Sequence, residues 1–126
     1  MSARSAALEI TPRDLEAIDS LWESGLGAAY DVYRSHVQDG RVALAAALVE
    51  TGIALQGVGS HLAAPGELLL GDLCLARASR LLADAADQGL QVAFARVVER
   101  VTAEAAEGVE VTDIRRLLRS AVGGRS

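Results

Sequence analysis

A run of apolar residues from Leu68 to Ala76 constrains the fold of this chain more than any other feature. It reads Leu-Leu-Leu-Gly-Asp-Leu-Cys-Leu-Ala, and Asp72 is its only charged residue. A helix with this sequence is apolar on nearly every side, so every side must be covered. The carboxylate of Asp72 then needs a proton or a partner, because an unpaired buried charge is costly. The partner would come from another helix, from a backbone amine near the helix start or from another chain. We therefore expect this helix to be the centre of the fold, and Asp72 to have a structural role.

Apolar residues recur at helical spacing along the rest of the chain, and no alternating strand pattern persists. Helices are predicted over residues 12–22, 26–38, 41–61, 67–86, 90–107 and 113–122. Apolar residues make up 51 % of the chain but aromatic residues only 3 %, and this composition favours helices. The sequence thus predicts an all-α single domain over residues 1–126, a bundle of five or six helices with frayed ends at 1–10 and 123–126.

Local signals mark several of these helix ends. Thr11 and Pro12 suit the first positions of a helix, and Asp14 lies where a capping-box acid belongs. Asp39-Gly40 is a turn signal, and Gly108 is placed to end the helix before it.

Charge and cysteine content restrict the class of protein. The net charge is −5, whereas a nucleic-acid-binding surface is basic, so no nucleic-acid partner is expected. The single cysteine cannot form an internal disulfide, which favours a reducing compartment and predicts a cytoplasmic protein. The most apolar long stretch, residues 42–62, contains Glu50 and Gln56, so stable membrane insertion is not expected.

The histidines and the cysteine give no pattern typical of a catalytic or metal site. His36 and His61 lie far apart and lack carboxylates at ligand spacing, and His61 is expected to close a helix, where a cation suits the helix dipole. Cys74 has no second cysteine and is predicted to be a packed core thiol.

Two further features leave alternatives open. Glu50 is the only acid in a long apolar helix, and it lies either on the solvated strip of that helix or in a functional site. Gly57-Val58-Gly59 lacks the dinucleotide fingerprint and is interpreted as a close-packing or helix-end feature. No catalytic residue and no metal ligand is predicted.

The segment Leu70-Gly71-Asp72-Leu73-Cys74-Leu75-Ala76-Arg77-Ala78, followed by Leu81-Leu82-Ala83, resembles the Gly-Asp-x-Leu-Leu-Ala-x-Ala segment of trans-polyprenyl diphosphate synthases. The next helix ends in Glu107-Gly108, as the corresponding family helix ends in Glu-Gly. Residues 45–55 resemble the family's helix that leads into its first aspartate-rich motif. The resemblance covers about residues 41–108 and implies a truncated isoprenoid-synthase fold.

The chain departs from this family at the metal-binding motif. The Asp-Asp-x-x-Asp motif would fall on residues 57–61, where Gly57, Val58 and His61 replace the three aspartates. These residues cannot hold Mg²⁺ with oxygen ligands, and the family needs Mg²⁺ to neutralise the leaving diphosphate. The sequence also ends before the second aspartate-rich motif. The chain alone is therefore expected to bind no cofactor and to be no enzyme, with Mg²⁺ only on a catalytic partner.

Some members of the family are heteromers in which a small subunit without these motifs pairs with a catalytic subunit. The resemblance therefore implies a non-catalytic small subunit of a heteromeric, hexaprenyl- or heptaprenyl-type diphosphate synthase, which makes long-chain diphosphates for quinones. Its expected interface residues are Leu69, Leu70, Gly71, Asp72, Leu73, Leu75 and Ala76. A self-associating helical homodimer with an interaction or regulatory role, and a small lipid- or prenyl-binding bundle, remain as alternatives.

Overall fold

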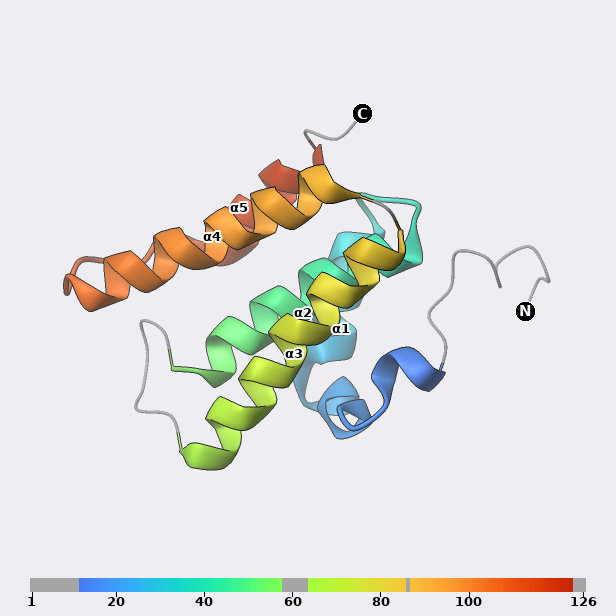
Figure 1. Cartoon of the computed structure of the whole chain (residues 1–126), viewed down its shortest axis with the longest axis horizontal. Helices are drawn as coiled ribbons and strands as arrows, with labels where there is room; N and C mark the ends of the chain where they lie inside the picture. Colours follow the sequence, from blue (N-terminus) through green and yellow to red (C-terminus); the bar gives the residue numbers. More distant parts are fainter. Residues whose placement is uncertain (1–11, 58–63, 86, 124–126) are drawn as a thin grey trace.

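The computed structural model describes residues 12–57, 64–85 and 87–123, which form an all-α fold, as predicted (Figure 1). The α-helices of these residues are α1 (Gly27–Arg34), α2 (Gly40–Leu55), α3 (Pro65–Asp84), α4 (Gln88–Ala106) and α5 (Ile114–Gly123). Three short helical turns precede α1: Pro12–Leu15, Asp19–Leu21 and Trp22–Leu26. No described helix is both long and apolar enough to span a bilayer. The chain ends expected to fray lie almost wholly outside the described residues.

The central helix is α2, whose sequence is rich in alanine. It contacts each of the other α-helices, and its side chains from Val42 to Val49 are all buried. The small side chains of Ala43, Ala45, Ala46 and Ala47 leave room for neighbouring helices to approach closely. The core of the protein therefore surrounds α2.

Residues 68–76 lie in α3, which is not the centre of the fold as expected, and the described part of the chain does not cover this helix on every side. α3 buries only one side, which consists of Gly71, Cys74, Ala78, Leu81 and Leu82. Leu68 and Leu69 remain 43 % and 71 % exposed. The position between the other helices is taken by α2, so α3 packs along it and keeps an outer face.

α2 and α3 cross at two glycines, Gly52 and Gly71. A Cβ atom built on Gly71 would lie 2.9 Å from the carbonyl oxygen of Gly52 and 2.6 Å from Cγ of Gln56. A Cβ atom on Gly52 would lie 3.0 Å from the carbonyl oxygen of Gly71. The glycine of the Gly71-Asp72 pair is thus required by close backbone packing.

The predicted helix over residues 12–22 is broken. Ala17 has a φ angle of 70°, a left-handed conformation that interrupts a right-handed helix. The guanidinium of Arg77, on α3, donates hydrogen bonds to carbonyl oxygens of this segment, those of Arg13, Asp14 and Glu16, at 3.3, 2.7 and 3.0 Å. This tertiary contact satisfies carbonyls that a continuous helix would have satisfied itself. Thr11, the expected cap, lies outside the described residues.

Two glycines end helices in left-handed conformations. Gly108 follows α4 with a φ of 75°, which confirms the predicted helix end. Gly57 follows α2 with a φ of 76°, and its N–H donates to the carbonyl of Ala54. α2 therefore ends at Leu55, earlier than the predicted end at residue 61, because Gly57 adopts the conformation that terminates helices at low cost.

Candidate functional site

The interface residues predicted from the sequence fall on two sides of α3. Gly71 faces α2 and is buried, and Leu70, Leu73 and Leu75 are partly buried against the core. Leu69, Asp72 and Ala76 are exposed. The seven residues therefore do not form one surface, and the second group is the more accessible to another molecule.

Asp72 is exposed and not buried, which corrects the expectation of a buried charge. Its Oδ1 accepts a hydrogen bond of 2.6 Å from Nε2 of Gln56, at the C-terminal end of α2. The contact comes from another helix, as anticipated, but it is solvent-exposed. Substitution of Asp72 should therefore cost far less stability than the about 3–5 kcal/mol typical of a broken buried pair.

An apolar groove of about 370 Å³ lies between α3 and α4, with Val49 of α2 also lining it. The lining residues are Val49, Leu75, Ala78, Ser79, Leu82, Gln91, Phe94, Ala95, Val98 and Glu99. Nε2 of Gln91 donates to the carbonyl oxygen of Ser79 and links the two helices. The groove suits an apolar side chain or aliphatic group, because most of its lining residues are apolar.

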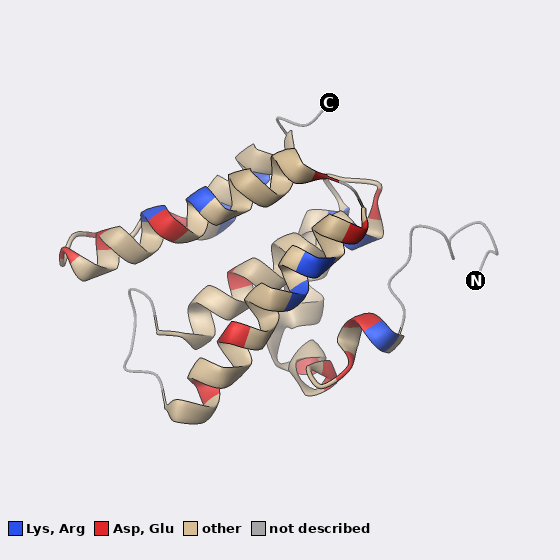
Figure 2. Cartoon of the chain, in the orientation of Figure 1, with Lys and Arg blue, Asp and Glu red and all other residues tan. Residues whose placement is uncertain are grey.

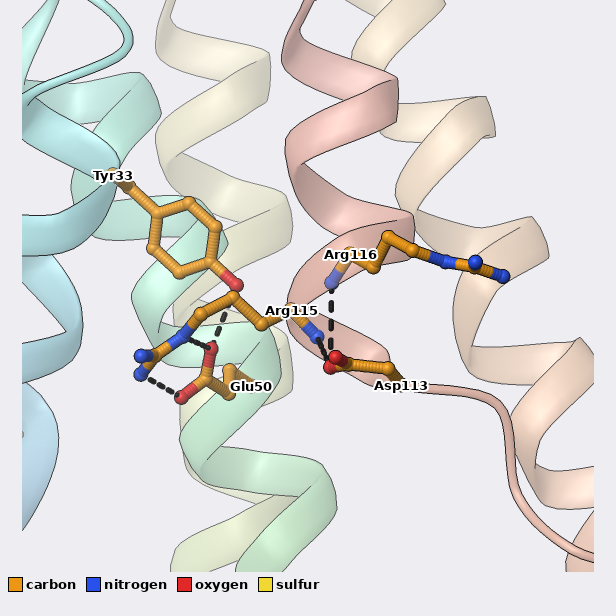
Figure 3. A network of polar contacts seen from close by, with 5 residues as sticks. All are labelled: Tyr33, Glu50, Asp113, Arg115 and Arg116. Carbon is orange, nitrogen blue, oxygen red and sulfur yellow. Dashed lines mark hydrogen bonds and ion pairs between the residues drawn. The ribbon is translucent and has the colours of Figure 1, made fainter.

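A polar network joins α1, α2 and α5 on another side of α2 (Figure 3). The hydroxyl of Tyr33 donates to Oε1 of Glu50 at 2.7 Å. Nε of Arg115 donates to the same oxygen at 2.9 Å, and its terminal nitrogen donates to Oε2 at 2.7 Å. Asp113 accepts from the backbone N–H groups of Arg115 and Arg116 and so begins α5. Glu50 thus ties α5 to the first two helices.

The pKa shifts in this network favour an ion pair between Arg115 and Glu50, with Tyr33 as a neutral hydrogen-bond donor. Burial raises the pKa of Tyr33 well above its usual range, and the hydrogen bond to Glu50 raises it further. The hydrogen bond to Glu50 raises the pKa of Arg115. Tyr33 therefore remains a neutral donor and Arg115 a cation, and the arrangement is that of a structural clamp between helices.

Sequence analysis left the role of Glu50 open and named neither Tyr33 nor Arg115 as its partner. The available signal was a single acid in an otherwise apolar helix, together with the only cluster of arginines, residues 115–119. Arg115 lies 65 residues from Glu50 in the sequence, so only the fold brings them together.

The remaining candidates contribute little to either site. His36 is exposed, whereas Val58 and His61 lie outside the described residues. Gly57, at a degenerate aspartate position, is the residue that ends α2. In the described ranges 12–57, 64–85 and 87–123, no three histidine, cysteine or acidic side chains are grouped so that they could hold a metal ion.

Cys74 is a fully buried free thiol, which confirms the predicted packed core cysteine. Burial raises its pKa from an ordinary value near 9.0 to about 11.

A group whose pKa is raised on folding, such as the Cys74 thiol, stabilises the protein below its unfolded pKa and loses this contribution as pH rises. The unfolding free energy should therefore fall between about pH 9 and pH 11. Urea denaturation at a series of pH values measures this fall. The unfolding free energy of Cys74→Ala should decrease less steeply over this pH range than that of the natural chain. Equal slopes for the two proteins would contradict the assignment of Cys74 as the titrating group.

Comparison with known proteins found no family model, no curated protein and no solved structure that matches this chain. No matched protein therefore assigns a family to this chain. In the fold, the Gly71-Asp72 pair lies where α3 crosses α2, and the Glu107-Gly108 pair follows the last residue of α4.

Proposed function

We propose that this chain is the small, non-catalytic subunit of a heteromeric polyprenyl diphosphate synthase and that the outer face of α3 contacts the catalytic subunit. The observation that carries the proposal is the exposure of Leu68 and Leu69 on the same helix that carries the family-like segment. Contiguous exposed apolar side chains are typical of protein interfaces. An apolar groove lies farther along the same helix, where Leu75, Ala78 and Leu82 line it. The proposal thus assigns a partner to a surface that the isolated chain leaves uncovered.

The two sides of α3 have different roles in this proposal, one in folding and the other in binding. Gly71 contacts α2 through its backbone, whereas Asp72 and Ala76 point outward. In this proposal the inner side maintains the shape of the subunit, and the outer side recognises the partner. The catalytic subunit would supply both aspartate clusters, and these would hold the Mg²⁺ needed to neutralise the leaving diphosphate.

The test is co-expression with a polyprenyl diphosphate synthase subunit that carries both aspartate-rich motifs, preferably one encoded beside this chain. The two chains should purify together, and prenyl transfer should require the complex. Leu69→Glu should abolish co-purification without lowering the melting temperature, because Leu69 is 71 % exposed. Val109→Glu is the matched control, since Val109 is 51 % exposed but lies beyond α4. Equal binding of both variants, or prenyl transfer by this chain alone, would contradict the proposal.

A further inference from the structure

The exposed row along α3 has a symmetric spacing. Its members are Leu69, Asp72, Ala76, Arg80 and Ala83, all of them exposed. Successive members are three, four, four and three residues apart, so the spacing is the same in both directions along the helix. Helical residues at these intervals lie on one face. Ala76 is the centre of the row, with Asp72 one turn before it and Arg80 one turn after it. Figure 2 shows that acidic residues in the first half of α3 are followed by basic residues.

This pattern is complementary to itself when two helices run antiparallel. A two-fold axis at Ala76 brings Asp72 of each copy to the level of Arg80 of the other, and Leu69 to the level of Ala83. Each copy then contributes one acid and one base, which gives two ion pairs. A parallel arrangement would instead place the two Asp72 carboxylates together, and like charges repel at such a contact.

We propose that a second copy of this chain docks on the outer face of α3, with the two α3 helices antiparallel around Ala76. The small side chain of Ala76 allows the two backbones to approach closely at the axis. Leu68 and Leu69 supply apolar area at each end of the contact. A contact between single helices buries less than the about 1,600 Å² of a standard interface, so the dimer should be weak and dependent on concentration.

The charges needed for this pairing are available. Gln56 donates to Oδ1 of Asp72 and orients the carboxylate, and none of the residues that the structure describes donates to its Oδ2. Arg80 has no hydrogen-bond or ion-pair partner within the described part of the chain. Arg77, the other cation of α3, is held by carbonyl oxygens of the N-terminal segment and does not compete for Asp72.

The inference rests on the charge pattern of α3 and goes beyond the proposed function. Both concern the same face, so self-association and binding of a catalytic subunit would exclude each other. The tests below use the purified chain alone. If the purified chain does not dimerise, the co-purification experiment can still succeed. If the chain does not co-purify with a catalytic subunit, it can still form the dimer.

Sedimentation equilibrium over a concentration series should show a monomer–dimer equilibrium for the natural chain. Asp72→Arg and Arg80→Asp should each raise the dimer Kd at least about tenfold, because each places like charges opposite one another. The double variant Asp72→Arg/Arg80→Asp should restore the dimer, since it exchanges the two signs. Arg119→Asp, an equal charge reversal at an exposed position on α5, is the control and should leave the Kd unchanged.

Cysteine cross-linking tests the position of the axis. Ala76→Cys should form a disulfide with the same residue of a second copy under mild oxidation, whereas Ser120→Cys on α5 should not. Cys74 is fully buried and should not interfere. A monomer at all concentrations, a dimer that tolerates the single charge reversals, or a double variant that does not recover would overturn the proposal.

Discussion

Replacing Gly71 with alanine is expected to lower the free energy of unfolding by about 1–3 kcal/mol, the usual cost of overpacking a core. The new Cβ would lie 2.9 Å from the carbonyl oxygen of Gly52. This oxygen belongs to the last turn of α2 and already accepts from the N–H of Gln56, so it cannot move aside easily. Alanine favours helices over glycine by about 0.8–1.0 kcal/mol, so the steric cost must exceed this gain. Urea denaturation followed by far-ultraviolet circular dichroism measures the difference.

Gly66→Ala is the matched control for this substitution, because Gly66 lies in the same helix and a Cβ there would meet nothing within 4 Å. We expect this variant to be as stable as the natural chain or more stable by up to about 1 kcal/mol. If Gly71→Ala were as stable as Gly66→Ala, the close crossing of α2 and α3 would be wrong. Gly52→Ala should resemble Gly71→Ala, since its Cβ would meet the carbonyl of Gly71 at 3.0 Å.

The helical segments could be predicted from the sequence because their signals are local. The fold class follows from apolar periodicity, and Gly108 marks the end of α4 through its own backbone conformation. The N-terminal segment was mispredicted because its apolar spacing is helical, whereas its carbonyl groups bond to Arg77 on a helix that lies far away in sequence. A local pattern contains no information about such a tertiary contact.

The centre of the fold was assigned to the wrong helix for a related reason. Both α2 and α3 are strongly apolar, and hydrophobicity alone does not decide which of them is surrounded. α2 has alanines along its length, and this allows helices to pack around it on several sides. α3 has large leucines, of which Leu69 remains 71 % exposed. Residue size, in addition to apolarity, would have favoured α2 as the central helix.

The candidate site could be predicted only in part. The sequence identified the α3 segment but did not divide it, because the direction of each side chain depends on where α2 lies. Gly71 and Asp72 are adjacent in sequence, yet one contacts α2 through its backbone and the other is exposed. The helical phase of α3 relative to α2 therefore determines which residues can reach another molecule.

Replacing Glu50 with alanine is expected to lower the free energy of unfolding by about 2–3 kcal/mol. The substitution leaves the hydroxyl of Tyr33 and the guanidinium of Arg115 without their shared acceptor. Tyr33 is fully buried, so its hydroxyl gains little compensation from water. The Arg115 side chain is 40 % exposed and can be rehydrated, which limits the loss to less than that of a fully buried pair. Glu99→Ala, at an exposed position of α4, is the control and should change stability by no more than about 0.5 kcal/mol.

Two further measurements separate a clamp from a general loss of stability. Amide hydrogen exchange of α5 should accelerate in Glu50→Ala more than exchange of α2 and α3, because Arg115 joins α5 to α2. Tyr33→Phe should remove part of the alkaline destabilisation. The pKa of Tyr33 is raised on folding, so its contribution is present below about pH 10, the pKa of an unfolded tyrosine, and is lost as pH rises further. A Glu50→Ala variant with natural stability and natural exchange in α5 would show that the network does not hold α5 in place.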